Sequence, residues 1–156
     1  MKKGFAVFII LTLLVFLPAC STHASKSATY QVDTGDKIKV TVDIKAGYDL
    51  KMEVPFTISK DETDILFGTF DFLETYDTYY QLVKDDPNAA ILAEDSKDGN
   101  EYFFYTVNNL ESQTSEYDYF VKINNSQTVV IIGSMASREE AEAAFAAITL
   151  SLADSE

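Results

Sequence analysis

The sequence predicts an α+β domain in which helices pack on both faces of a largely antiparallel sheet, a three-layer arrangement. Three stretches, 65–70, 102–107 and 128–132, are apolar or β-branched at both parities, which is typical of strands covered on both faces. Two amphipathic helices, one in mid-chain and one near the C-terminus, can supply that cover. Because most links between strands are short, we expect antiparallel pairing.

The first half of this domain begins with two alternating stretches, 38–44 and 48–54, joined at Ala46-Gly47. Alternation of apolar and polar residues indicates strands with one buried face, and the short link predicts a hairpin. Gly68 interrupts the apolar strand 65–70, which indicates a bulge or a large group packed against the backbone. Three- and four-residue spacing of apolar residues over 72–83 then predicts a helix.

The second half alternates turn signals with strands. Asp98-Gly99 predicts a hairpin turn between a short strand at 91–93 and the strand 102–107. Strands at 117–123 and 128–132 follow. Ser137 and Glu140 form a capping-box pattern that opens a helix predicted to run to about residue 152.

The first twenty residues have the layout of an export signal. Lys2 and Lys3 precede an uncharged apolar run, and a small residue, Ala19, precedes Cys20, the only cysteine. This stretch resembles a bacterial lipoprotein signal, in which a lipobox ends at the cysteine that receives lipid; Pro18 is a less usual occupant of that motif. The resemblance implies cleavage before Cys20, acylation of Cys20 with chains such as palmitate, and a lipid anchor on the extracytoplasmic face of a membrane. An uncleaved anchor is disfavoured because the run is shorter than the roughly 20 residues that span a bilayer; a plain signal peptide with a free thiol is the other alternative.

This interpretation divides the chain into three segments. Residues 1–19 are the signal peptide, residues 20–35 are the lipidated cysteine with a flexible tether, and residues 36–156 are one α+β domain. The tether is predicted because 21–35 is small and polar without an apolar period. His23, the only histidine, lies in it, where it lacks the rigid support that a site needs.

Charge excludes some partners. The chain has 25 acidic and 12 basic residues and a net charge of −13. Nucleic acid is therefore not an expected partner, because binding it needs a basic footprint. The same charge repels anionic headgroups, so we expect lipid rather than protein to provide the anchoring.

The later elements resemble the Mog1/PsbP-like family. The features that carry the resemblance are a strand pair opening at 47–50, the Val54-Pro55 stop, the strand 129–134, and the closing helix that begins at Ser137-Arg138-Glu139-Glu140. The Trp that often follows the early proline in that family is absent. The resemblance implies a sheet between helices and accessory roles in binding proteins, and it carries over no catalytic residue.

Few residues suit catalysis or metal binding. A nucleophilic triad needs a base, and zinc typically draws on Cys and His, whereas the only Cys and His are Cys20 and His23. The candidate calcium ligands are Glu94, Asp95 and Asp98, but an EF-hand would need Glu where Tyr105 stands, and we favour a plain Asp-Gly hairpin. The paired carboxylates are interpreted as a solvated face rather than an acid–base site; they are Asp85 with Asp86, and Glu74 with Asp77 and Asp71.

The helix 72–83 carries Tyr76, Tyr79 and Tyr80. Tyrosine is enriched at recognition surfaces, but at helical spacing it more often lines the core; of Tyr79 and Tyr80, one is expected to be exposed. We therefore expect a non-enzymatic lipoprotein without a cofactor. It would be anchored in the bilayer through Cys20 and would bind another exported or membrane protein through these tyrosines. The alternative is a lipoprotein that binds a small ligand or a cation such as calcium.

Overall fold

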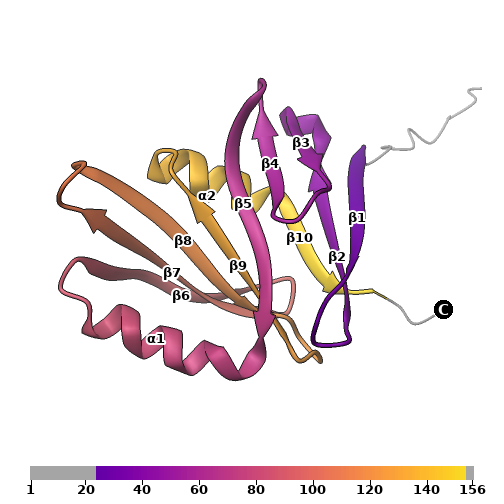
Figure 1. Cartoon of the computed structure of the whole chain (residues 1–156). Coiled ribbons are helices and arrows are strands. Elements are labelled where there is room, and N and C mark those ends of the chain that lie inside the picture. Colours follow the sequence, from indigo (N-terminus) through magenta and orange to yellow (C-terminus); the bar gives the residue numbers. More distant parts are fainter. Residues whose placement is uncertain (1–23, 154–156) are drawn as a thin grey trace, which may run out of the picture.

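The computed structural model describes residues 24–153, which fold into two antiparallel sheets with two α-helices (Figure 1). The small sheet has the order β1-β2-β10, and the large sheet the order β3-β4-β5-β9-β8-β7-β6. The strands of the small sheet are β1 (Ser25–Gln31), β2 (Lys37–Asp43) and β10 (Ile148–Leu152). Those of the large sheet are β3 (Tyr48–Lys51), β4 (Phe56–Lys60), β5 (Thr63–Phe72), β6 (Ala89–Lys97), β7 (Asn100–Asn109), β8 (Thr114–Lys122) and β9 (Thr128–Ser134).

Helical turns occupy little of the chain. The two α-helices are α1 (Tyr76–Asp85) and α2 (Arg138–Ala146), and the two 3₁₀ turns are η1 (Ile44–Ala46) and η2 (Leu73–Thr75). The capping box of α2 is confirmed: the Ser137 hydroxyl accepts from the Glu140 backbone N–H, and the Glu140 carboxylate accepts from the Ser137 N–H. Among residues 24–153, no helix is long and apolar enough to cross a membrane.

The prediction of an α+β fold with helices on both faces of one sheet is wrong, because the domain is mainly β. Most of one face of the large sheet is covered by the small sheet, with only α2 beside it. Alternation explains how the small sheet does this: Ile38, Val40 and Val42 are fully buried, while the residues between them point outward. The structure therefore does not support the three-layer arrangement implied by the resemblance to Mog1/PsbP-like proteins.

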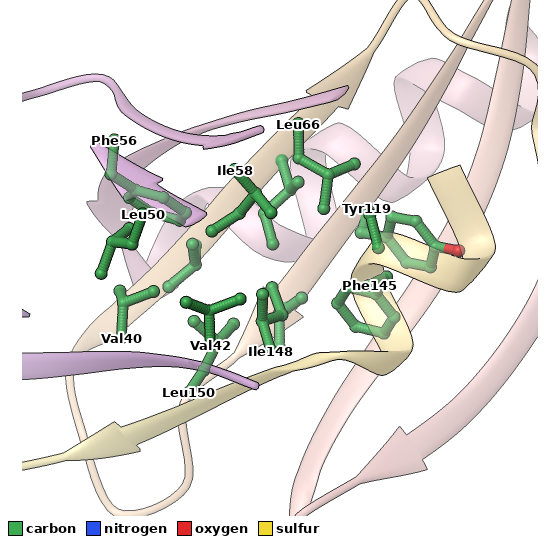
Figure 2. Packing of buried hydrophobic residues seen from close by; sticks show 14 of the residues in the cluster. Val40, Val42, Leu50, Phe56, Ile58, Leu66, Tyr119, Phe145, Ile148 and Leu150 are labelled. Atoms are coloured by element: carbon green, nitrogen blue, oxygen red, sulfur yellow. The ribbon is translucent and has the colours of Figure 1, made fainter. Parts of the chain in front are cut away.

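The main core lies between the two sheets. Figure 2 shows Val40, Val42, Ile148 and Leu150 of the small sheet facing side chains of the large sheet, among them Leu50, Phe56, Ile58 and Leu66. At one end the Tyr119 and Phe145 rings stack, with centroids 3.8 Å apart, and join α2 to β8. A second apolar cluster lies on the other face of the large sheet beneath α1, formed by Tyr76, Val83, Phe103, Tyr105, Phe120 and Val129.

The predicted hairpin between 38–44 and 48–54 is wrong. The strands β2 and β3 exist, but β2 pairs with β1 and β10, whereas β3 pairs with β4. The 3₁₀ turn η1 between them carries the chain from one sheet to the other. Val40, Val42 and Leu50 therefore meet face to face in the core instead of side by side in one sheet.

Two further boundaries need correction. The predicted tether 20–35 is wrong for its described part, because Ser25–Gln31 forms β1, which pairs along its whole length with β2 and buries Tyr30. The helix predicted to reach residue 152 ends at Ala146, and Ile148–Leu152 forms β10. Ile148 and Leu152 are four residues apart and so satisfy both helical spacing and strand alternation, and pairing with β2 decides for the strand.

Candidate functional site

The three tyrosines expected at a binding surface have different environments on α1. Tyr76 is buried, and its ring contacts Phe103 and Phe120 edge-on, so it belongs to the core. Tyr80 is half-buried and donates its hydroxyl hydrogen to Glu94. Tyr79 is 38% exposed, which confirms that one of the adjacent pair Tyr79 and Tyr80 lies at the surface.

The candidate calcium ligands lie on a β-hairpin. Asp98 and Gly99 both have positive φ and form the turn between β6 and β7, as an Asp-Gly hairpin requires. Glu94 accepts from Tyr80, Asp95 accepts from the Ser96 N–H, and Asp98 pairs with Lys97. Among residues 24–153, no group of three or more Asp, Glu, His or Cys side chains is placed to hold a metal ion.

The remaining predicted residues do not form a site in the described structure. Cys20 and His23 lie outside the described residues. Of the acidic pair, Asp86 accepts from the Asn88 N–H in the turn after α1, which is a structural contact. No arrangement of Asp71, Glu74 and Asp77 is seen that would serve acid–base chemistry: of these, only Asp71 accepts a hydrogen bond, from the N–H of the adjacent Phe72.

A row of directly opposed residues crosses the middle of the large sheet on the face that carries α1. From β7 through β8 and β9 to β5 the row reads Tyr105, Asp118, Gly133 and Phe67. Gly133 leaves no side chain at the centre of this row. A Cβ placed there would lie 3.1 Å from Asp118 Oδ1 and 3.5 Å from Glu116 Oε1, so both carboxylates converge over the glycine. We call Tyr105, Glu116, Asp118 and Gly133 the Gly133 cluster.

Burial controls the protonation of Asp118. Its side chain is 8% exposed, and this desolvation, together with the charge of Glu116, raises the pKa of Asp118 to about 7. Hydrogen bonds from the Tyr105 hydroxyl and from the Ser134 N–H oppose the shift without cancelling it. Burial, followed by the charge and hydrogen bond of Asp118, raises the pKa of Tyr105 in turn, so Tyr105 stays a hydrogen-bond donor.

No basic side chain of the described residues neutralises the cluster. Among residues 24–153, no Lys or Arg forms an ion pair with Asp118 or Glu116. Exposed rings flank it instead: Phe67, directly opposite Gly133, is 41% exposed, and Tyr79 lies over Phe120, two residues from Asp118 on β8. A buried carboxylate that is not matched by a cation is costly, and a cation supplied from outside would relieve that cost.

The sequence does not reveal this cluster, because Asp118 and Lys122 alternate with apolar residues in the predicted strand 117–123, a pattern typical of the solvent side of a half-buried strand. The strand is buried on both faces, so Asp118 alternates with Tyr119 but faces the Tyr105 and Phe120 side of the sheet. Two signals were available: a carboxylate within a strand whose other parity is aromatic, and a glycine, Gly133, inside the apolar strand that follows.

A separate groove of about 240 Å³ lies between the β1–β2 turn and β5. It is lined by Tyr30, Val54 and Phe70, with Asp33 and Asp71 at its polar part. The Tyr30 hydroxyl is buried and is the one buried side-chain polar atom among residues 24–153 that has no hydrogen-bond partner. This groove is smaller than the roughly 300–1,000 Å³ typical of pockets for drug-sized ligands.

Comparison with known proteins adds no relative: no protein-family model matches the chain, and no curated protein matches its sequence.

Proposed function

We propose that the protein is an extracytoplasmic lipoprotein, held on the membrane through acylated Cys20, whose β domain binds a basic segment of another exported or membrane protein. The domain acts as a binding module and not as an enzyme. The lipid anchor is supported by the signal pattern that ends at Cys20, and the binding role by the Gly133 cluster.

The observation that carries the binding role is a pair of converging carboxylates that forms no ion pair with any Lys or Arg of residues 24–153. Asp118 and Glu116 overhang Gly133, and the exposed rings of Phe67 and Tyr79 flank them. A Lys or Arg side chain suits this environment because its charged head pairs with carboxylates while its aliphatic stem packs against rings. A basic side chain with apolar neighbours is therefore the group that this face recognises.

Long-range electrostatics favour the same partner. The chain carries a net charge of −13, and such a field attracts positively charged partners and raises their association rate. The expected partner surface is therefore basic overall, with apolar side chains near the cation that enters between Asp118 and Glu116.

The anchor is tested by fractionation of cells that express the full chain or its Cys20→Ala variant. The wild type should stay with membranes and partition into detergent, whereas the variant should be released or retained only as unprocessed precursor. Equal membrane retention of both proteins at the mature size would contradict acylation.

The binding role is tested with a short fluorescent peptide of alternating Arg and Leu residues, followed by anisotropy. Asp118→Asn should weaken binding at least about tenfold, equal to about 1.4 kcal/mol. Glu111→Gln is the matched control, because it removes the same charge at an exposed site outside the cluster. Equal weakening by both variants would show non-specific attraction and would contradict a site at Gly133.

The pH dependence sharpens this test. A bound cation favours the ionised form of Asp118, whose pKa is raised to about 7 in the free protein. Affinity for the peptide should therefore rise as the pH is increased through 7 and level off above it. In Asp118→Asn the rise should be absent.

The second candidate function is binding of a small ligand, and the partnerless Tyr30 hydroxyl beside the 240 Å³ groove favours it. A saturable thermal shift with a small polar molecule, reduced by Tyr30→Phe, would support this role. Loss of that hydroxyl without any effect on such shifts would contradict it.

A further inference from the structure

The outer face of the small sheet differs in composition from the rest of the molecule. Its side chains point away from the core on all three strands, opposite the buried Ile38, Val40 and Val42. They are small, polar or basic: Ser25, Ser27, Thr29, Gln31, Lys37, Lys39, Thr41, Asp43, Thr149 and Ser151. In register, Thr29 and Ser151 both lie next to Lys39, so hydroxyls surround the central lysine.

Positive charge predominates on this face, although the whole chain has 25 acidic and 12 basic residues. Lys37 and Lys39 lie on it, and Lys45 follows in η1 at its end. Asp43 is its one acidic residue among residues 24–153, and its carboxylate accepts from the Lys45 backbone N–H. None of these three lysines forms an ion pair within the described part of the chain.

This face begins very close to the predicted lipid. The carbonyl of Ala24 accepts from the Ile44 N–H, so the chain is fixed to the domain from Ala24 onward. Only three residues separate Ala24 from Cys20, and four Cα–Cα steps span at most about 14 Å. A bilayer interface is about 5–8 Å thick on each side, so an acylated Cys20 would hold the start of β1 beside the headgroups.

Two surfaces adjoin Ala24, and charge distinguishes them. The end of the domain formed by the β4–β5 turn exposes Asp61 and Glu62. Anionic headgroups repel that end and attract the lysines of the small sheet, each lysine near such a surface contributing about fivefold to the equilibrium.

We propose that the outer face of β1, β2 and β10 docks on the anionic phospholipid headgroups of the membrane that carries the acyl chains. This inference rests on the proposed acylation of Cys20. The acyl chains hold the protein on the bilayer, and the lysines set its orientation. Because α1 lies on the far side of the large sheet from the small sheet (Figure 1), docking directs the Gly133 cluster away from the membrane.

The test is cysteine labelling of the membrane-bound full chain. Single cysteines replace Thr29 or Thr149 on the docking face, and Thr78 or Gln81 on α1 as controls; all four positions are exposed. The purified lipoprotein is reconstituted in vesicles of phosphatidylcholine with phosphatidylglycerol, or of phosphatidylcholine alone, and treated with a bulky water-soluble maleimide.

In the anionic vesicles the Thr29→Cys and Thr149→Cys proteins should label several-fold more slowly than in detergent, while the α1 positions label at equal rates in both. Neutral vesicles, or Lys37→Gln with Lys39→Gln and Lys45→Gln, should abolish the protection. Equal rates at all four positions in anionic vesicles would overturn the docking, even with Cys20-dependent anchoring intact.

The same labelling on native membranes separates this inference from the lipid proposal. Membrane retention of Cys20→Ala at the mature size would contradict acylation. Protection of Thr29→Cys in that retained protein would still support docking, and its absence would overturn docking as well.

Discussion

The two faces of the large sheet are built from the same strands but differ in what covers them. On the face toward the small sheet, Phe56, Ile58, Leu66 and Ile132 are fully buried, and a second sheet and α2 cover them. On the other face, α1 covers the aromatic cluster around Phe103 and Phe120, but next to this cluster the sheet carries carboxylates and exposed rings.

Two glycines on neighbouring strands show the same contrast at the scale of single atoms. A Cβ at Gly68 would lie 2.0 Å from the ring of Phe56. The ring can pack on the backbone of β5 only because residue 68 has no side chain. A Cβ at Gly133 would meet carboxylate oxygens at 3.1 and 3.5 Å. One face is closed by apolar packing, and the other keeps polar groups together at some cost in stability, which is typical of a site.

The largest expected effect comes from filling the glycine on the closed face. Gly68→Ala should lower the free energy of unfolding by about 3 kcal/mol, because the added methyl must displace a fully buried ring. Urea unfolding measures it, with Gly133→Ala as control, for which we expect about 1 kcal/mol. If Gly133→Ala lost more stability than Gly68→Ala, the conclusion that the face toward the small sheet is the more tightly packed one would be wrong.

An intermediate effect is expected on the open face, and it depends on pH. In the folded protein Asp118 has a pKa of about 7, whereas in the unfolded chain it ionises near 3.8. The folded state therefore holds the extra proton between about pH 4 and pH 7, and stability falls as the pH rises through that window. Asp118→Asn removes the ionisation, so at pH 8 the variant should be more stable than wild type.

Unfolding curves of both proteins at pH 4 and pH 8 test the direction of this stability difference. At pH 4 the two proteins should have nearly equal midpoints, since Asp118 is protonated in the folded wild type. A variant that is less stable than wild type at pH 8 would show that Asp118 is ionised and stabilised at neutral pH.

The smallest effect compares the helices on the two faces. Ser137→Ala removes the capping box of α2 and should cost about 1 kcal/mol. Thr75→Ala at the start of α1 should cost little, because Thr75 makes no capping bond to the helix; its hydroxyl donates to the Phe72 carbonyl. Equal losses in thermal unfolding would contradict this difference between α1 and α2.

Local patterns predicted the positions of most elements but not their partners. The alternation at 38–44 and 48–54, the Asp98-Gly99 turn and the Ser137 capping box all occur near where the sequence placed them. Which strands pair is decided by contacts distant in sequence, as for β2 with β10. The strand β1 was missed because it contributes only Ala28 and Tyr30 to the apolar interior and owes its form to pairing with β2.

The candidate site could be predicted only in part. Tyr79 was among the residues expected at a surface, and it borders the Gly133 cluster through Phe120. Asp118 and Gly133 come from strands separated by a turn, and their proximity depends on register, which composition does not reveal. The pKa of Asp118 depends on burial by both neighbouring strands and by the side chain of Tyr105, so no local pattern indicates it.

The pairing of β2 with β10 has a consequence for the order in which the chain can fold. The two strands lie more than a hundred residues apart, yet β2 is the centre of the small sheet and forms both of its strand pairs. A chain that emerges from a ribosome or a membrane channel with its N-terminus first can form β1 with β2 early. The sheet is complete only when Ile148–Leu152 has also emerged. We therefore expect the emerging chain to remain without its full core, and to be accessible to chaperones and proteases, until β10 has emerged and paired with β2.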